Sequence, residues 1–258
     1  MSGGVLAEIA DSVGRRLAAG AYRPRKDAAS APDGKRFAAS LAEPGTRIIA
    51  EMKRRSPSAG EICPHLDRRV ETFALAYRRG HAAAISVVTE PEFFGGDPEW
   101  IGRARRISGL PVLMKDFVLA EEQLDFAASH GADAVLLIAA ILGGDALPRL
   151  RAAAEERGLA AVVEAHDAAE VARAAASGAS IVGVNARDLR SFAVDRDRAA
   201  ALGNAIPAGV VRLAESGIRS REDVERLSAA GFTAFLVGET LLRAEDPEAT
   251  LRSLRGAS

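Results

Sequence analysis

From residue 47 onward, short apolar runs alternate with longer segments that carry an apolar stripe at helical spacing. The short runs are almost continuous in β-branched and aliphatic residues, as is typical of strands buried on both faces. The longer segments, such as 67–80 and 221–231, end on a glycine, as a helix with its C-cap does. The predicted strands are residues 47–53, 83–90, 111–116, 133–139, 160–166, 180–186, 210–216 and 233–239.

Eight strand–helix units without a Gly/Ser/Pro linker predict an α/β protein, a (β/α)8 TIM barrel with an N-terminal helical extension. A doubly wound open sheet is the alternative, but eight regular units favour closure. We expect residues 47–258 to form a single catalytic domain. Residues 1–46 do not follow this alternation of strands and helices, and they are predicted to pack on the barrel. Residues 5–20 have the pattern of an amphipathic helix, and residues 22–35 have that of an irregular connection. This pattern leaves open whether the extension plugs the bottom of the barrel or reaches over its top.

Composition narrows the possible partners of this 258-residue chain. Its 34 basic and 35 acidic residues give a net charge of −1, which argues against nucleic-acid binding. No apolar run approaches the roughly 20 residues that span a bilayer, and the first residues do not form a secretory signal. The single cysteine, Cys63, excludes an internal disulfide and suits the cytosol. We therefore expect a cytoplasmic protein without nucleic-acid or membrane partners.

Charged and polar side chains stand at the C-terminal ends of several predicted strands. Side chains alternate along a strand, so Glu51 and Lys53 point the same way. In a barrel these ends form one ring, where active sites of this fold lie. A lone charge there would be a solvated loop residue or a structural ion pair, but so many strand ends together favour a site. The residues are Glu51, Lys53, Lys115, Glu164, Asn185, Arg187, Glu215 and Ser216.

Mixed charges in such a mouth are expected to shift one another's pKa values. A lysine that is partly desolvated or beside another cation has its pKa lowered, and a glutamate in an apolar setting has its pKa raised. Both shifts would provide proton donors and acceptors that work near neutral pH.

Glycines after the last two predicted strands indicate a phosphate site. Gly217 and Gly238 let backbone N–H groups approach an anion at a helix N-terminus. Glu239 begins the final helix and would repel phosphate unless its side chain turns outward. Two loops are predicted to shape the rim: 56–60, where Pro57 restricts the chain, and 91–97, with Phe93 and Phe94. These two phenylalanines either pack over the barrel or wall a pocket for an aromatic substrate, and the second interpretation is favoured for Phe94.

The four histidines do not form a recognisable catalytic or metal motif. His81 and His130 fall at helix–strand junctions on the opposite side, and His65 is in a loop. His166 is near the mouth, but nothing pairs with it at metal-ligand spacing. Because neither a Ser-His-Asp arrangement nor a zinc motif can be assembled, nucleophilic and metal-assisted hydrolysis are disfavoured.

The strand segments together resemble one family, indole-3-glycerol-phosphate synthase, which closes the indole ring in tryptophan biosynthesis. The resemblance covers roughly residues 47–245, whereas residues 1–46 match only loosely. It implies ring closure of 1-(2-carboxyphenylamino)-1-deoxyribulose 5-phosphate, a small phosphorylated aromatic substrate, with loss of carbon dioxide and water. It implies no cofactor and no metal, and we expect a monomer. The matching segments are IIAEMKRRSPSAG, ISVVTEPEFFGGD, PVLMKDF, GADAVLLIAAIL, VVEAHD, GVNARDL, AESGI and FLVGETLLR.

By this resemblance, Lys115 is the general acid that protonates the substrate carbonyl, and Glu164 is the general base with Glu51 as its partner. Lys53 holds the departing carboxylate or acts as acid in the dehydration, and the division between the two lysines stays open. Asn185 and Arg187 position hydroxyls and carboxylate. Further matches are Glu215 and Ser216 on strand seven, Ser56, Gly217, Gly238 and Glu239 at the phosphate, and Phe94, Phe117, Leu136 and Leu189 around the aryl ring.

Three alternatives remain open to the sequence. The first is another phosphate-binding barrel, such as phosphoribosylanthranilate isomerase or the tryptophan synthase α-subunit. An isomerase of that kind would use a Cys/Asp pair at strand ends, but Cys63 lies in a loop. A non-catalytic barrel would lack at least one of Glu51, Lys53, Lys115 and Glu164, and all are present. The third is the same reaction on a modified substrate.

Overall fold

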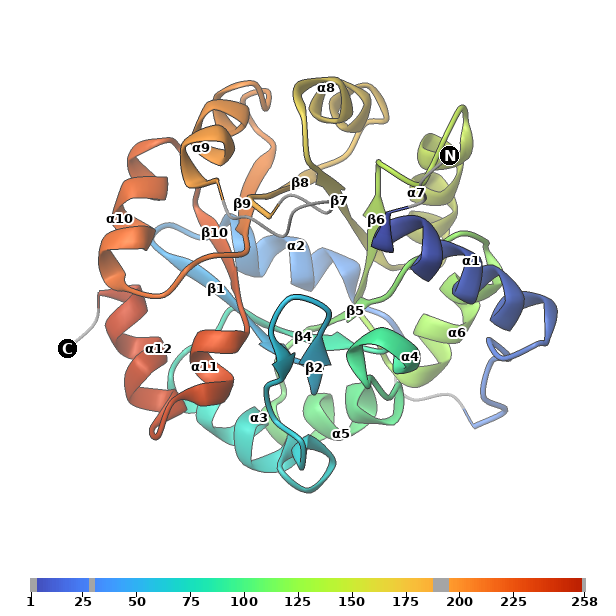
Figure 1. The fold of residues 1–258 in the computed structure, drawn as a ribbon, viewed down its shortest axis with the longest axis horizontal. Helices are drawn as coiled ribbons and strands as arrows, with labels where there is room; N and C mark the ends of the chain where they lie inside the picture. The colour runs from blue at the N-terminus through green and yellow to red at the C-terminus, as the bar shows by residue number, and fades with distance from the viewer. Residues whose placement is uncertain (1–3, 28–30, 188–194, 257–258) are drawn as a thin grey trace.

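Parallel strands close into a barrel in this computed structural model, which describes residues 4–27, 31–187 and 195–256 (Figure 1). The first and last barrel strands pair in parallel and so close the sheet. This confirms the predicted (β/α)8 barrel. In the order in which neighbouring strands pair around the barrel, the eight strands are β1 (Arg47–Met52), β10 (Ala234–Val237), β9 (Val211–Glu215), β8 (Ile181–Asn185), β7 (Ala160–Ala165), β6 (Ala134–Ile138), β5 (Val112–Lys115) and β4 (Ala84–Val88).

An outer layer of helices covers the barrel, and their ends follow the expected capping chemistry. The side chains of Asp167, Asp195, Ser220 and Asp246 each accept a hydrogen bond from a backbone N–H in the first turn of the helix that follows. Within the described residues, no helix has the length and apolar character needed to cross a membrane. The layer consists of α3 (Val70–Arg79), α5 (Glu99–Ser108), α6 (Glu122–His130), α7 (Ala146–Glu156), α8 (Ala168–Ala176), α9 (Arg196–Asn204), α10 (Arg221–Ala229) and α12 (Pro247–Arg255).

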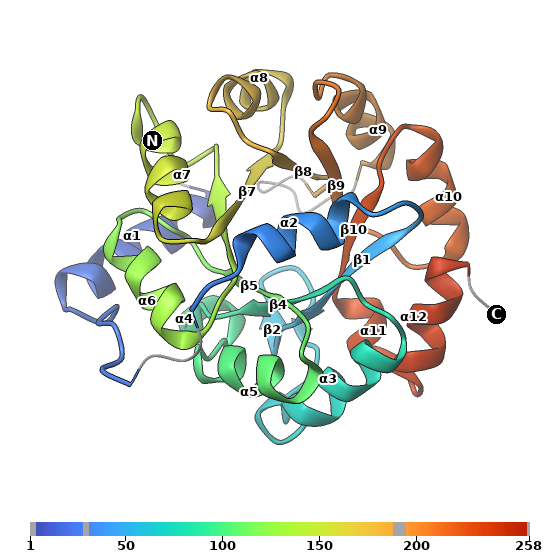
Figure 2. The same ribbon diagram turned by 180° about the vertical axis from the view of Figure 1, so that it is seen from behind.

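The N-terminal end of the barrel is plugged by α2 (Gly34–Ala42), which crosses it in the rear view (Figure 2). Phe37 and Leu41 are fully buried and belong to one cluster with barrel residues such as Leu113. At Gly34, an added Cβ would lie 2.3 Å from the backbone nitrogen of Ala160, so the close approach requires glycine. The extension therefore completes the interior core from below.

The other half of the extension, α1 (Val5–Ala18), lies at the opposite end of the barrel. Ser12 Oγ donates a hydrogen bond of 2.6 Å to Glu92 Oε2 in the loop after β4. The Tyr22 ring then packs edge-on against Phe126, with 5.3 Å between centroids. The sequence left open whether the extension plugs the bottom or reaches over the top, and the structure shows that it does both.

Short elements in the loops around the mouth complete the architecture. The segment predicted only as a turn around Pro57 forms a two-stranded hairpin, because Arg55–Ser56 (β2) pairs antiparallel with Gly60–Glu61 (β3). The Glu90 carboxylate accepts hydrogen bonds from the N–H groups of three following residues and so starts a short helix. These further elements are η1 (Leu66–Arg68), α4 (Pro91–Phe94) and α11 (Glu239–Arg243).

Candidate active site

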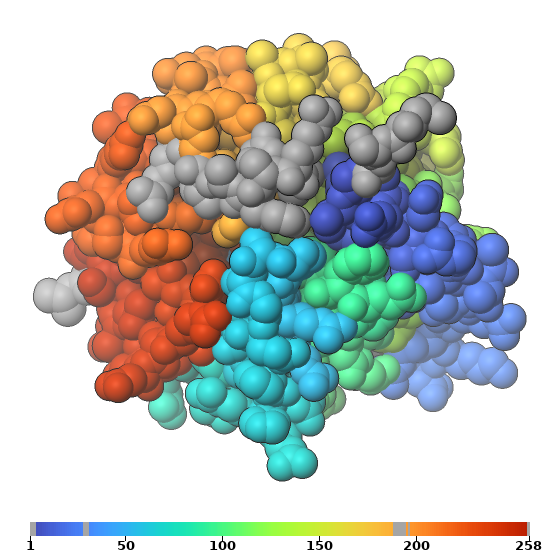
Figure 3. All heavy atoms as spheres, viewed as in Figure 1, coloured from blue at the N-terminus to red at the C-terminus, as the bar shows by residue number. Residues whose placement is uncertain are grey.

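A cavity of about 430 Å³ opens at the C-terminal ends of the strands. On this face α1, the β2–β3 hairpin, α4 and α11 lie around the mouth (Figure 3). Of the predicted site residues, Glu215 lies beneath the cavity wall, and Leu189 lies outside the described residues. The cavity brings together all the others: Glu51, Lys53, Ser56, Pro57, Phe94, Lys115, Phe117, Leu136, Glu164, Asn185, Arg187, Ser216, Gly217, Gly238 and Glu239.

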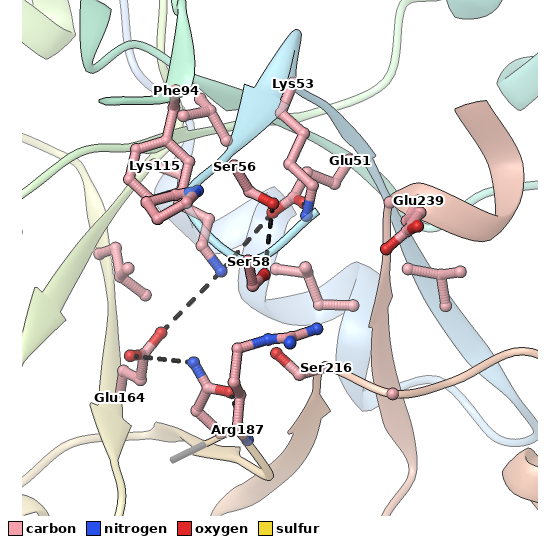
Figure 4. Close-up of a pocket in the computed structure, with 18 of the residues that line it drawn as sticks. Glu51, Lys53, Ser56, Ser58, Phe94, Lys115, Glu164, Arg187, Ser216 and Glu239 are labelled. Atoms are coloured by element: carbon pink, nitrogen blue, oxygen red, sulfur yellow. Dashed lines mark hydrogen bonds and ion pairs between the residues drawn. The ribbon is translucent and has the colours of Figure 1, made fainter. Parts of the chain in front are cut away.

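The Lys115 ammonium stands among three buried carboxylates, of which Glu51 and Glu164 are labelled in Figure 4. Its Nζ lies 2.7 Å from Glu215 Oε2, 3.6 Å from Glu51 Oε2 and 3.9 Å from Glu164 Oε2. The second lysine, Lys53, lies 2.6 Å from Glu51 Oε1. One charged cluster therefore forms at the strand ends, as the sequence pattern predicted. It contains Glu51 at the end of β1, Lys53 just after it, and Lys115, Glu164 and Glu215 at the ends of β5, β7 and β9.

This arrangement reverses the expected pKa shift of the central lysine. Burial alone would lower the pKa of Lys115, but the carboxylates of Glu215, Glu51 and Glu164 raise it above its ordinary value. Burial likewise opposes the ionised form of Glu51, but the two lysines lower the pKa of that carboxyl. The expectation of a lysine with a lowered pKa is therefore wrong for Lys115, because its neighbours are anions rather than cations.

The other two glutamates of the cluster shift in opposite directions. Burial and the neighbouring Glu164 carboxylate raise the pKa of Glu215 to about 7, against the attraction of Lys115. For Glu164, burial is outweighed by His166, Lys115 and Asn185, which lower its pKa to about 2. The expectation that a buried glutamate has a raised pKa is therefore confirmed for Glu215 and is wrong for Glu164. Two carboxyls with separated pKa values provide one group that stays ionised and one that exchanges a proton near neutral pH.

Two glycines make room for these buried carboxylates. A Cβ at Gly183 in β8 would lie 2.3 Å from Glu215 Oε1, and a Cβ at Gly238 would lie 2.4 Å from Glu51 Oε1. A glycine inside a strand signals such a close approach. Gly238 was predicted only at the phosphate site, and Gly183 was not among the predicted site residues.

We expect Gly183→Ala to lower kcat by about 10²-fold, because a displaced Glu215 carboxylate no longer holds Lys115 in place. Steady-state kinetics measures this, with KM nearly unchanged, because Gly183 does not line the cavity. The matched control is Gly102→Ala in α5, where the added Cβ meets only the His130 carbonyl oxygen at 3.5 Å. A Gly183→Ala enzyme as active as this control would show that the position of Glu215 does not matter.

One end of the cavity is built from loops after β9 and β10. Ser216 and Gly217 both have positive φ, 69° and 76°, a strained conformation for the serine. Glu239 was expected to repel an anion only if its side chain did not turn outward, and its Oε1 accepts a hydrogen bond of 3.0 Å from Arg243 Nε. Its carboxylate is therefore paired along α11. Arg219 and Arg243, which the sequence analysis missed, also line this end.

The opposite end of the cavity is apolar. The rings of Phe94 and Phe117 stack at a tilt, with 5.9 Å between centroids. Phe93 packs against the main core and does not line the cavity, whereas Phe94 lines it. Of the two interpretations of this loop, packing over the barrel therefore applies to Phe93 and walling a pocket applies to Phe94. Three further residues, by which α1 closes this end, were not predicted, although the apolar stripe of the helix was a usable signal: Val5, Leu6 and Ile9.

The histidine beside the cluster has partners that the sequence analysis did not find. Among the described residues, no group of three or more His, Cys, Asp or Glu side chains is arranged to hold a metal ion. His166 instead lies between two carboxylates, those of Glu164 and Glu170. The spacing Glu-x-His-x-x-x-Glu, with i, i+2 sharing a strand face, was the available signal.

Solved structures with similar architecture include a 3-hexulose-6-phosphate synthase, with a TM-score of 0.65 at 18% identity, covering 82% of this chain and 99% of that one. A mutant tryptophan synthase α-subunit from Pyrococcus furiosus has a TM-score of 0.60 at 15% identity, covering 82% of this chain and 98% of that one. At these identities the likeness concerns the fold alone.

Sequence comparison is more specific. The family model for indole-3-glycerol phosphate synthase matches residues 6–254. A curated relative, indole-3-glycerol phosphate synthase 2 of Streptomyces coelicolor, is 45% identical over 254 residues, 98% of each chain. The Mycobacterium ulcerans indole-3-glycerol phosphate synthase is 41% identical over 245 residues, 95% of this chain and 89% of the relative. The chain therefore belongs to the indole-3-glycerol phosphate synthase family.

Proposed function

We propose that this chain converts 1-(2-carboxyphenylamino)-1-deoxyribulose 5-phosphate to indole-3-glycerol phosphate, carbon dioxide and water in tryptophan biosynthesis. The observation that carries the proposal is the position of Lys115, whose ammonium is surrounded by three carboxylates inside a cavity with one apolar and one glycine-rich end. Such a cavity suits a substrate with an aryl ring at one end and a phosphate at the other. The enzyme is thus a carbon–carbon lyase of the family identified above.

Ring closure requires a polarised carbonyl, because attack by the aryl carbon that bears the carboxylate interrupts aromaticity. Lys115 donates its proton to the carbonyl oxygen as the new C–C bond forms. Loss of carbon dioxide from the same aryl carbon then restores the aromatic ring. Lys53 holds the departing carboxylate. In the dehydration, a lysine protonates the leaving hydroxyl and Glu164 accepts the carbon-bound proton, with Glu51 coupling the two lysines.

Binding is divided between the two ends of the cavity. The backbone at Gly217, Gly238 and Glu239, with the Ser56 hydroxyl, holds the phosphate. Asn185 and Arg187 orient the hydroxyls and the carboxylate. The apolar end, including Phe94, Phe117, Leu136 and the face of α1, encloses the aryl ring. All these groups come from one chain, which supports a monomeric enzyme, and the biosynthetic family and single cysteine support a cytoplasmic location.

The direct test is to mix the purified protein with 1-(2-carboxyphenylamino)-1-deoxyribulose 5-phosphate. We expect indole fluorescence to appear together with one equivalent of carbon dioxide. A parallel reaction with phosphoribosylanthranilate tests the isomerase alternative and is expected to give no product. Fluorescence that stays at background with the first substrate, or turnover of the second instead, would contradict the proposal.

A further inference from the structure

His166 follows β7 directly, and its imidazole lies behind the cavity wall rather than in it. Its Nδ1 forms a hydrogen bond of 3.1 Å with Glu170 Oε2, in the first turn of α8. Its Nε2 lies 3.1 Å from Glu164 Oε1, an ion pair by distance with the ring tilted off the ideal hydrogen-bond line. The ring thus has a carboxylate at each nitrogen, and only 12% of its side chain is exposed.

Carboxylates at both nitrogens favour the charged form of the ring. An ionised carboxylate only accepts hydrogen bonds, so the Nδ1 contact with Glu170 places a proton on Nδ1. In a neutral ring, Nε2 would then carry a lone pair 3.1 Å from the Glu164 carboxylate, which is repulsive. The imidazolium donates from Nδ1 to Glu170 and places its positive charge beside Glu164.

Glu170 is held in place by contacts that do not involve the ring. Its Oε2 also accepts a hydrogen bond of 2.7 Å from the backbone N–H of His166. Its own backbone N–H donates to Asp167 Oδ1 at 2.8 Å, as part of the start of α8. Because the helix start fixes this carboxylate, the ring is oriented with Nε2 toward Glu164.

His166 is the nearer of the two cations paired with Glu164. Lys115 Nζ is 3.9 Å from Glu164 Oε2 and makes its short contact, 2.7 Å, with Glu215 instead. Asn185 Nδ2, which donates to Glu164 Oε1 at 3.3 Å, is neutral. When Lys115 gives its proton to the substrate, it ceases to be a cation, and the imidazolium is left as the charged partner of Glu164.

We propose that His166 is a positioning residue for this reaction: held as an imidazolium by Glu170, it orients the Glu164 carboxylate and keeps it ionised while Lys115 donates its proton. The inference rests on the proposed role of Glu164 as the base. It is consistent with the electrostatics, because the two carboxylates outweigh burial and raise the pKa of His166 to about 10. Above that pH the ring becomes neutral and no longer forms an ion pair with Glu164.

The first test is the pH profile of His166→Gln, which keeps an amide donor and removes the charge. The groups that face the ring are Glu164 on β7 and Glu170 on α8, with Lys115, Glu215 and Asn185 around Glu164. We expect the acid limb of kcat, which reports the ionisation of Glu164, to move at least one unit to higher pH. On this limb, the ratio of kcat to its value at pH 8 is then expected to be about tenfold lower than in the wild type at the same pH. KM is expected to stay unchanged. A loss of kcat that is equal at every pH would mean a purely structural role and would overturn the proposal.

The matched control is His130→Gln, a second buried histidine near a carboxylate, with Nε2 3.7 Å from Glu99 Oε1 at the opposite end of the barrel. It is expected to keep the wild-type pH profile. Glu170→Gln retains His166 but removes its anchor, and it is expected to move the acid limb in the same direction as His166→Gln. A Glu170→Gln profile identical to wild type would count against the proposal.

The second test needs no substrate. The ring ¹⁵N signals of His166 in the wild-type protein are expected to be those of an imidazolium at pH 8, and Glu170→Gln is expected to lower the titration midpoint by at least one unit. A neutral ring at pH 8 in the wild type would overturn the role of His166. Failure of the ring-closing assay with an imidazolium present would instead count against the proposed reaction, so the two failures are distinguishable.

Discussion

Lys115→Arg is expected to lower kcat on the order of 10³-fold while leaving the protein folded. Arginine keeps the positive charge among Glu215, Glu51 and Glu164, so the buried carboxylates retain a cation. It does not release a proton near neutral pH, because its guanidinium stays protonated. Lys115→Arg therefore separates proton donation from charge compensation. The measurement is single-turnover formation of indole fluorescence.

Lys115→Met provides the complementary variant. It is expected to lose the same turnover and, in addition, about 3–5 kcal/mol of stability, because removing one partner of a buried ion pair leaves uncompensated charge. Thermal unfolding of the two variants measures the difference. If Lys115→Arg retained kcat within tenfold of wild type, the role of Lys115 would be electrostatic and its assignment as the acid would be wrong.

The barrel could be predicted from the sequence because each strand is a separate apolar run between glycine-capped helices. The predicted strand 160–166 corresponds to β7 at Ala160–Ala165, and 133–139 corresponds to β6 at Ala134–Ile138. The plug helix α2 could not be predicted in this way. Its burial of Phe37 and Leu41 depends on a barrel bottom assembled from strands spread along the whole chain, from Ile49 in β1 to Leu236 in β10.

The membership of the site was more predictable than its electrostatics. Closure of a parallel barrel brings strand ends to one mouth, so residue type and position were enough to bring Lys53, Lys115 and Glu164 together. The direction of each pKa shift depends on distances that no spacing contains. Lys115 lies 2.7 Å from a carboxylate, and Glu164 has an imidazole at 3.1 Å. The spacing of His166 excludes a metal motif, but only the 3.1 Å distance identifies it as a counter-ion of Glu164.

Replacing Glu164 by glutamine is expected to lower kcat by about 10²–10⁴-fold with little change in KM, because the amide cannot accept the carbon-bound proton. The effect on stability depends on pH. The pKa of Glu164 is lowered to about 2 from an ordinary value near 4.5. The carboxylate therefore contributes stability that is fully present above pH 4.5 and is lost as pH falls toward 2. Glu164→Gln lacks this contribution, so thermal unfolding followed from pH 6 to pH 3 is expected to show a shallower decline than in the wild type.

The charge-matched control for Glu164→Gln is Glu156→Gln, an exposed position at the end of α7. It is expected to keep wild-type kcat and the wild-type decline of stability with acid. Kinetics and unfolding test different properties of the same carboxylate. If Glu164→Gln kept kcat within tenfold but lost the acid-dependent stability, Glu164 would be a structural counter-ion of Lys115 and His166, and the base of the reaction would have to be sought in Glu51 or Glu215. The 2.7 Å contact of Glu215 with Lys115 and its pKa raised to about 7 would then make it the first residue to replace.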